Sequence, residues 1–514
     1  MSQQFTNHYQ FSIERASVVE EERGQYRGVP IRERVARCIW FGQYLDSEAL
    51  HTLDGESVQV VTPGWWNVES GPDFLKAELA VGEGAVERGD VEIHLHASGW
   101  YQHGHHKDSN YNNVFLHVVL WNDREDDFVV NQAGQPVRQL IIEDNLEREL
   151  GELIDLLAQE DFPQPLSATA GLCNQFINEE RVAESWVGDF LDDAGDERIL
   201  SKARFFDRRS AQAGDDQAFY EGFMSALGYK RNKEPFETLA RTVPLSFLHP
   251  LVKHGPAALQ AHLFDVSGLL PGEQLLPGMP DPETWEIQQD YSTVLQETPR
   301  ISADSRMKKD DWNFSGTRPV NFPTRRIAVA SHFVAENLEG GLLDSVCEVI
   351  LSAAVEPEAI SPATVREIRK KLLDFLSAGT DPYWSHRCTF GGKPSPKPMK
   401  LIGAERVNVV LVNVVIPALL ARASRESNSV LESILHEVYD QLPPLVETQV
   451  TRFMIARVLG DKERTGRLVT SARRQQGLYQ LYSDFERDDR SCDECPFARA
   501  MLLEEEPPLA PFQE

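Results

Sequence analysis

The sequence predicts an α/β N-terminal domain with a mixed β-sheet, followed by a largely α-helical region. Three observations support this fold class. One amphipathic helix precedes several short runs that alternate apolar and polar residues. Alternation with a period of two is typical of strands, because successive side chains point to opposite faces of a sheet. From about residue 147 the apolar residues recur at helical spacing instead, with Pro/Gly-rich breaks between the runs.

The N-terminal elements follow in order. Residues 29–50 predict a helix, because Val35, Cys38 and Ile39 give an apolar face and Pro30 lies near the start. The run NNVFLHVVLW is the most apolar of the predicted strands, which is typical of a buried strand. Strands are predicted within residues 57–68, 73–82, 90–100, 112–121 and 135–144.

The domain boundaries follow from composition. We predict the α/β domain at residues 1–150, a helical domain at 151–280 and a second helical region with basic loops at 281–495. The acidic, Pro-rich segment at 496–514 predicts a disordered tail. The apolar run at 407–423 is short and interrupted, so we expect a buried core helix and no membrane span.

The charge and the N-terminus limit the classes of function. The formal net charge is −29, so a nucleic acid could bind only through local basic patches. The N-terminal residues lack a basic region followed by an apolar stretch, which predicts no signal peptide. Six cysteines in 514 residues do not indicate a disulfide framework. We therefore expect a cytoplasmic protein that binds no membrane.

A candidate catalytic site lies on a predicted hairpin. Asp73 follows Pro72 at the start of one strand, and Glu92 and His94 are two residues apart on the next. Residues two apart in a strand share a face, so Glu92 and His94 point the same way. Carboxylates on neighbouring strands can bind Mg²⁺ or Mn²⁺, and Glu33 in the preceding helix could add another. The alternative is an ordinary amphipathic hairpin with chance carboxylates.

Histidines are concentrated around this hairpin. Six of the 14 histidines lie within a short stretch. We expect His96, His103 and His105 to act as metal ligands, with Asp108 orienting an imidazole. Histidines with carboxylates suit Zn²⁺, Mn²⁺ or Fe²⁺ better than Mg²⁺. His117, in an apolar strand, is instead expected to be a core residue with a satisfied hydrogen bond.

The order of a helical Glu, Pro-Asp, a hairpin and Glu-x-His resembles the PD-(D/E)xK nuclease superfamily, in which the last position is lysine. The resemblance implies a restriction-endonuclease-like fold in which Asp73 and Glu92 bind metal. His94 in place of lysine would be a general base, a third ligand or a sign of lost activity.

Over nearly the whole chain, the motifs GPDF, GDVEIHLHASGW, HGHH, YNNVFLHVV, ALGYKRNKEPFETLA, RPVNFPTRRIA, VNVVIPALLARA, QQGLYQLY and CDEC resemble a second family. This is the bacterial domain-of-unknown-function family 2851. Membership of that family implies no activity.

Basic residues and a cysteine pair suggest two further sites. Arginines in RPVNFPTRRIA and ARRQQ could contact phosphates, and the alternative is a set of solvated helix faces with paired charges. The predicted nucleic-acid-binding residues are Arg318, Arg325, Arg326, Arg473 and Arg474. Cys492 and Cys495 have the spacing of half a structural zinc site.

These observations lead to one expected function and two alternatives. We expect a metal-dependent nuclease-like phosphodiesterase acting on nucleic acid, with Asp73, Glu92 and His94 as its catalytic residues and Mg²⁺, Mn²⁺ or Zn²⁺ as its metal. The first alternative is a non-enzymatic, nucleic-acid-associated adaptor on a degenerate nuclease fold. The second is a histidine/carboxylate metal hydrolase acting on another substrate.

Overall fold

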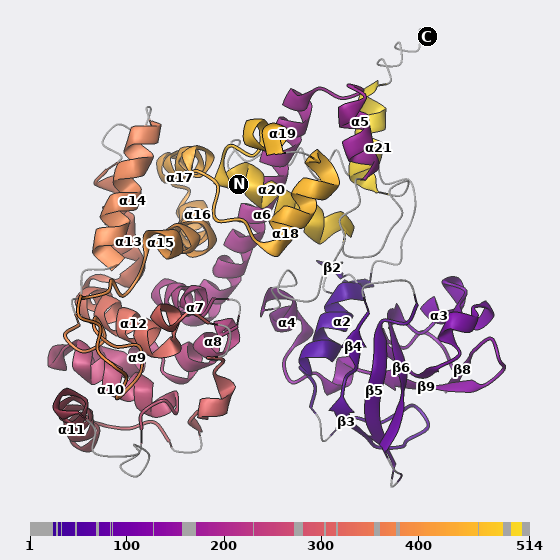
Figure 1. Ribbon diagram of the computed structural model, residues 1–514, viewed down its shortest axis with the longest axis horizontal. Helices are drawn as coiled ribbons and strands as arrows, with labels where there is room; N and C mark the ends of the chain where they lie inside the picture. Colours follow the sequence, from indigo (N-terminus) through magenta and orange to yellow (C-terminus); the bar gives the residue numbers. More distant parts are fainter. Residues whose placement is uncertain are drawn as a thin grey trace. The chain divides into compact units, whose positions relative to one another are not determined.

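The chain forms two compact units in the computed structural model (Figure 1). The sheet unit comprises His8–Val187, Thr448–Thr465 and Leu478–Glu514, and the helical unit comprises Met1–Asn7, Gly188–Glu447 and Gly466–Gly477. The predicted boundary at residue 280 therefore lies inside the helical unit. The structure describes residues 24–26, 29–31, 33–46, 49–67, 71–82, 84, 86–126, 128–156, 171–229, 231–271, 281–302, 305–314, 317–353, 360–376, 381–460, 462–486 and 495–505.

The predicted mixed sheet is confirmed. Its strands are β3 (Val58–Thr62), β4 (Trp65–Trp66), β5 (Phe74–Val81), β6 (Val86–His96), β7 (Val114–Trp121), β8 (Phe128–Val130) and β9 (Pro136–Ile141). They run in the order β3-β5-β6-β7-β9-β8, and β4 pairs with β5. The β6–β7 and β7–β9 pairs are parallel, whereas the other pairs are antiparallel.

The first predicted helix is shorter than expected. Residues Val29–Ile31 form β2, which pairs with β1 (Gly24–Tyr26), and the helix α2 covers only Glu33–Gly42. The helices α2 and α4 (Leu150–Leu156) share one apolar core with the sheet, and this core includes Trp40, Phe74 and Ile93. Alternation along β6 then directs Glu92 and His94 to the other face.

Three short helices connect the parallel strands β6 and β7. They are α3 (Gly99–Gln102), η1 (His105–Lys107) and η2 (Ser109–Tyr111). Trp100 of α3 packs with Val114, Val129 and Val137 in a small second cluster. This cluster anchors the connection, which carries several of the histidines.

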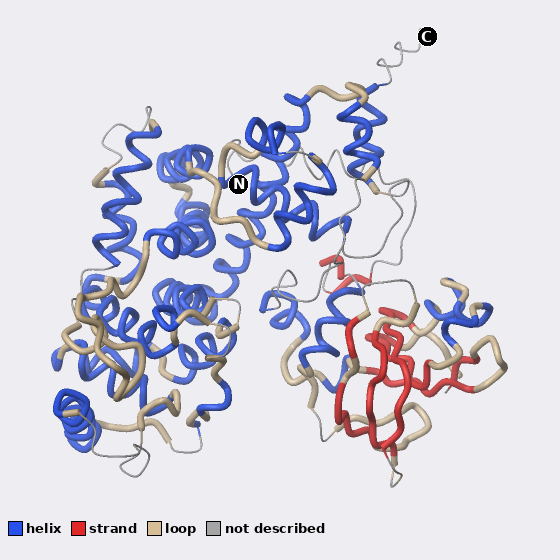
Figure 2. Tube along the Cα trace, in the orientation of Figure 1, coloured by secondary structure: helices blue, strands red, loops and turns tan. Residues whose placement is uncertain are grey.

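The rest of the described chain is mostly helical, and every described strand lies between Gly24 and Ile141 (Figure 2). The helices from the unit boundary onward include α6 (Glu184–Ala213), α7 (Asp215–Leu227), α8 (Lys233–Thr242), α10 (Pro256–Val266), α11 (Pro282–Glu297), α12 (Pro323–Asn337), α13 (Leu342–Leu351), α14 (Pro362–Leu376), α15 (Ala404–Val410), α16 (Ile416–Glu426) and α17 (Ser429–Gln441). Their apolar faces form one large core. Helix followed by sheet and then by helices is therefore the observed order, as predicted.

Two expectations for the later chain can be compared with the structure, and only the second needs adjustment. The apolar helix Ala404–Glu426 has 23 residues, so by length and composition it could cross a membrane, but 72% of its most apolar window is buried. That burial is typical of the core helix we predicted. At the C-terminus, Pro496–Glu505 form helix α21 where a disordered tail was expected, and residues 506–514 lie outside the described residues.

Candidate metal centre

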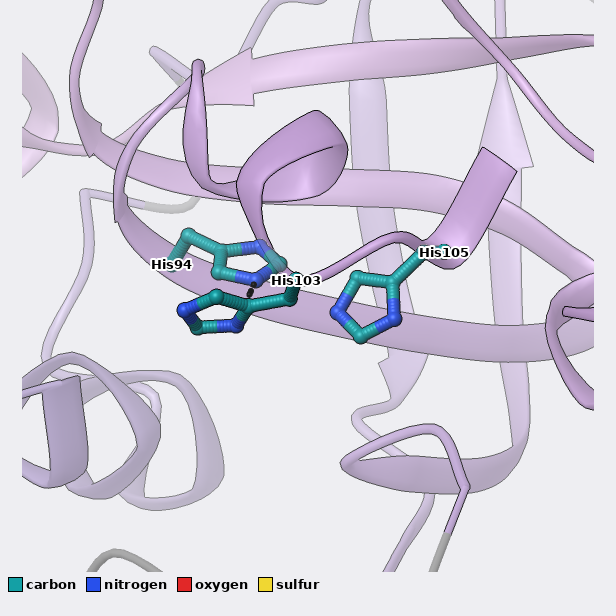
Figure 3. A group of neighbouring side chains, drawn as sticks. All are labelled: His94, His103 and His105. Carbon is teal, nitrogen blue, oxygen red and sulfur yellow. Dashed lines mark hydrogen bonds between the residues drawn. The ribbon is translucent and has the colours of Figure 1, made fainter. Parts of the chain in front are cut away.

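Three histidines from different elements converge on the face of β6 that is turned away from the apolar core shared with α2 and α4 (Figure 3). His94 belongs to β6, His103 follows α3 and His105 begins η1. One ring nitrogen from each lies within 4.8 Å of the others. The His94 Nε2 and His103 Nδ1 atoms are 3.1 Å apart, the contact dashed in Figure 3. Three imidazole nitrogens this close together can share one metal ion.

Glu92 adds a carboxylate oxygen to this group. Its Oε1 atom lies 3.1 Å from Nε2 of His105 and 3.9 Å from Nε2 of His94. Its Oε2 atom accepts the backbone N–H of Asp73 at 3.0 Å, which fixes the rotation of the carboxylate. The four candidate ligands are therefore three nitrogens and one oxygen, from Glu92, His94, His103 and His105.

His105 provides the test of whether a metal fits here. Its Nε2 atom is buried and makes no hydrogen bond to any of the described residues, although it lies beside the Glu92 carboxylate. A buried polar atom without a hydrogen bond costs free energy, which a metal bond would recover. The ring is held in place by Tyr111, whose centroid is 3.8 Å away, and by Trp100 at 5.4 Å. The donor set therefore fits a resident metal ion.

A chain of hydrogen bonds orients the His94 ring through its Nδ1 atom. Gln139 donates its side-chain N–H to the Asp126 carbonyl at 2.8 Å, so its Oε1 faces Nδ1 of His117 at 3.3 Å. His117 Nδ1 then donates to Gln139, and its Nε2 accepts from Nδ1 of His94 at 2.9 Å. These roles assign the lone pair of His94 to Nε2, the atom that faces the other ligands.

Burial sets the charge of the site. Burial lowers the pKa of His94 well below its usual value, that of His105 to about 4 and that of His117 to about 3. These imidazoles are therefore neutral near pH 7 and keep the lone pairs that a metal requires. Burial raises the pKa of Glu92 to about 8, although Arg37 opposes that rise. A cation bound at the site would favour the ionised carboxylate.

Asp73 and Glu33 face a different partner from the one predicted. Asp73 Oδ1 lies 3.0 Å from Nε of Arg37, and Asp73 Oδ2 accepts the Ile93 N–H at 3.0 Å. Glu33 pairs with the same arginine, one helical turn away on α2. Arg37 therefore contacts one oxygen of each carboxylate, and the metal-ligand roles of Asp73 and Glu33 stay predictions.

His96 also lies apart from the candidate ligands. It is the last residue of β6, and its ring packs at a tilt against Trp121 with the centroids 5.2 Å apart. The metal-ligand role of His96 therefore stays a prediction. His94, which the sequence offered as a general base or a third ligand, is one of the converging residues instead.

Gly99 allows α3 to lie directly on the His94 ring. A Cβ atom built at Gly99 would come within 2.6 Å of Cδ2 of His94. Since such contacts do not occur in folded proteins, only glycine fits at this position without displacing the ring. The close packing therefore restrains the His94 ring in addition to its contact with His117.

A family model described as "Protein of unknown function (DUF2851)" matches residues 33–447. The chain belongs to this family. Comparison with curated proteins and with solved structures gives no match. The matched residues include every candidate ligand of the metal centre, whereas Arg473, Arg474 and the cysteine pair lie beyond them.

In this DUF2851 member, two of the predicted nucleic-acid-binding arginines are buried. Arg325 donates to the carbonyl oxygens of Trp384 and Lys400, and Arg326 donates to that of Leu401. Neither side chain lies on the outer surface, so their predicted role as direct contacts for a nucleic-acid strand is corrected. Arg318 is exposed, and its predicted role stays a prediction.

The second arginine pair is neutralised by carboxylates. Arg473 makes two hydrogen bonds to Asp196, at 2.8 and 2.6 Å, and Arg474 contacts both oxygens of Asp192. Both guanidiniums are therefore occupied by carboxylates within the helical unit, and their phosphate-binding role stays a prediction.

The cysteine pair is described only in part. Cys495 is half-buried, while Cys492 lies outside the described residues, so the structural zinc site stays a prediction.

Several site residues were missed by sequence reasoning. Arg37 is hidden in an amphipathic helix, where its spacing of four from Glu33 indicated only a local pair. Gln139 carries no recognisable signal, because it contacts His117 across neighbouring strands. Tyr111 lies within the histidine-rich stretch and could have been suspected on that ground alone.

Proposed function

We propose that the chain is a metal-dependent phosphodiesterase acting on nucleic acid. In this proposal the resident ion is held by His94, His103, His105 and Glu92. The observation that carries it is the convergence of the three imidazoles, together with the buried, unsatisfied Nε2 of His105. A nitrogen-rich donor set favours Zn²⁺, Mn²⁺ or Fe²⁺ over Mg²⁺.

The order of elements supports the nuclease-like part of the proposal. Helix α2 precedes three strands, β3, β5 and β6, that pair antiparallel, and β7 then joins β6 in parallel. Asp73 stands at the start of β5, and Glu92 and His94 lie on β6. This is the arrangement that the resemblance to the PD-(D/E)xK superfamily leads us to expect of a restriction-endonuclease-like core.

The side chains around the metal have separate tasks in this proposal. A divalent ion would act as a Lewis acid and lower the pKa of a water molecule. Arg37 balances the buried charge of Asp73 and Glu33. Burial raises the pKa of Tyr111, so the phenol stays protonated and can donate a hydrogen bond to a phosphate oxygen.

One observation favours a second candidate function. Asp73 is bound by Arg37 and Ile93, so the centre lacks the two-carboxylate ligand set that the nuclease resemblance implies. A histidine/carboxylate hydrolase acting on another substrate would need only the remaining four ligands. The acidic net charge of −29 agrees with a substrate other than nucleic acid.

The test combines metal analysis with a cleavage assay on the full-length protein. We expect bound Zn²⁺, Mn²⁺ or Fe²⁺, and cleavage of DNA or RNA that Glu92→Gln reduces by more than about 100-fold, since changes behind the ligands alone cost roughly 10–100-fold. His96→Gln is the matched control and should keep both metal and activity.

Three other outcomes separate the alternatives. Bound metal without cleavage of single- or double-stranded DNA or RNA would reject the phosphodiesterase and favour the second hydrolase. Absence of metal together with absence of cleavage would reject both. Salt-sensitive nucleic-acid binding in that last case would favour the adaptor.

A further inference from the structure

The helical unit contains two buried arginines and one half-buried arginine that form no ion pair with a carboxylate of the described residues. Arg325 and Arg326 lie in the first turn of α12, and Arg406 lies in the first turn of α15. No carboxylate of the described residues lies within 4.0 Å of these three guanidiniums. Buried charges are normally paired, so the excess positive charge needs an explanation. It is the more unusual in a chain whose net charge is −29.

Tyr229 connects two of these arginines. The guanidinium carbon of Arg406 lies 3.3 Å from the centroid of the Tyr229 ring, and that of Arg326 lies 5.3 Å from it. Arg326 donates to the Tyr229 hydroxyl at 2.8 Å, and that hydroxyl donates to Asn321 at 2.9 Å. Arg406 also donates to the Ala226 carbonyl at 3.0 Å. The tyrosine therefore fixes both guanidiniums without neutralising either.

The arginines of this group have hydrogen-bond donors without acceptors, which indicates the kind of ligand that could bind to them. The Nε atoms of Arg325, Arg326 and Arg406 are buried and have no acceptor among the described residues. Arg326 is only 3% exposed. Burial, with a smaller contribution from the neighbouring guanidiniums of Arg406 and Arg325, lowers its pKa to about 10, although Tyr229 opposes that fall. An acceptor with negative charge would relieve both the unsatisfied donors and the mutual repulsion.

The backbone adds to the positive potential. The N-terminal end of a helix carries a partial positive charge, which disfavours arginine and favours anions. Helix α12 spans Pro323–Asn337, long enough for this effect, and two of the arginines lie at its start. Two exposed cations lie near the group in sequence. The Lys400 carbonyl accepts a hydrogen bond from Arg325, and Arg318 lies three residues before Asn321, which accepts one from Arg326. Together these features attract a compact, doubly charged anion.

We propose that Tyr229, Arg326 and Arg406 form a binding site for a phosphoryl group, supplied either as free phosphate or as a terminal phosphate monoester. Guanidinium groups match the geometry of phosphate oxygens, and Arg406 and Tyr229 are only partly buried, so a ligand can reach them. This site is independent of the proposed hydrolase, because it uses other residues in the other unit.

Calorimetric titration of the full-length protein with inorganic phosphate at constant ionic strength tests this site. We expect saturable binding that Arg406→Gln weakens by about tenfold or more, as for the loss of a hydrogen bond to a charged group. Arg366→Gln, an exposed arginine on α14, is the matched control and should bind as the unmodified protein does. Glu92→Gln should also leave phosphate binding unchanged, which separates this test from that of the hydrolase.

A second titration identifies the source of the phosphoryl group. Tighter binding of a 5′-phosphorylated oligonucleotide than of its 5′-hydroxyl counterpart would support a nucleic-acid terminus, and equal affinities alongside phosphate binding would support free phosphate. Circular dichroism checks the fold, and Tyr229→Phe repeats the test if Arg406→Gln is unfolded. Absence of saturable phosphate binding, or unchanged affinity in the folded variants, would overturn the proposal.

Discussion

Replacing Arg37 with methionine is expected to destabilise the sheet unit by about 3–5 kcal/mol, the usual cost of leaving one partner of a buried ion pair alone. The Arg37 and Asp73 side chains are 17% and 6% exposed, and their contact distance is 3.0 Å. Burial raises the pKa of Asp73 well above its usual value, and Arg37 opposes that rise. Without Arg37, Asp73 would have to ionise unpaired or bind a proton.

Hydrogen exchange across β5 and β6 is the appropriate readout, because a chain with two units need not unfold in one step. Arg88→Met is the control: Arg88 is 65% exposed in its pair with Glu78, and an exposed pair contributes only about 0–1 kcal/mol. Adding Asp73→Asn to Arg37→Met should recover part of the loss, since Asp73, the more deeply buried of the two carboxylates that pair with Arg37, then carries no charge. Equal exchange in both single variants would refute the structural role of Arg37.

Replacing Gln139 with methionine is expected to weaken zinc binding by about 10–100-fold. Gln139 is fully buried, and its oxygen contacts His117 rather than a candidate ligand. A loss of zinc affinity on replacing Gln139 would therefore act through His117. Without the Gln139 oxygen, His117 can adopt the other tautomer and donate to His94. His94 Nδ1 would then accept, which moves its proton to Nε2, the atom that should bind the metal.

Competition with a chromophoric chelator measures this affinity, and Gln59→Met, an exposed glutamine on β3, is the matched control. Both variants should keep the far-ultraviolet circular dichroism of the unmodified protein. Unchanged zinc affinity in Gln139→Met would show that the Gln139–His117–His94 chain does not orient the ligand.

The fold was predictable where one local pattern dominated. Alternating residues identified β5, β6 and β7, because one face of each strand must be apolar. The start of α2 was missed because Val29–Ile31 instead pair with β1, a contact that helical periodicity does not reveal. Pro496–Glu505 were expected to be disordered from their composition, yet they form a helix.

The site was predictable only in part. Glu92 and His94 share a face by alternation, and His103 and His105 are close in sequence, so these four residues could be found. Asp73 was expected to bind metal because the sequence did not reveal that Arg37 reaches it. The His117–Gln139 contact depends on the pairing of β7 with β9, which brings together two residues that are 22 positions apart in the sequence. No local pattern reveals that pairing.

The arginines illustrate a different limit. Sequence reasoning treated Arg325, Arg326, Arg473 and Arg474 alike, because their charge and their polar context are similar. The structure separates them by their partners: two face carboxylates, and two lie among carbonyl oxygens without a counter-charge. Only tertiary contacts distinguish a neutralised arginine from one that still needs an anion.

X-ray absorption spectroscopy of the zinc-loaded, full-length protein tests whether the four candidate ligands bind one ion. We expect one ion per chain with three imidazole nitrogens at about 2.0–2.1 Å and a carboxylate oxygen at about 2.0–2.2 Å. His105→Gln should lose one imidazole from the spectrum, whereas His96→Gln should leave it unchanged. A coordination sphere of oxygens alone, or a spectrum that changes with His96 and not with His105, would contradict the proposed metal centre.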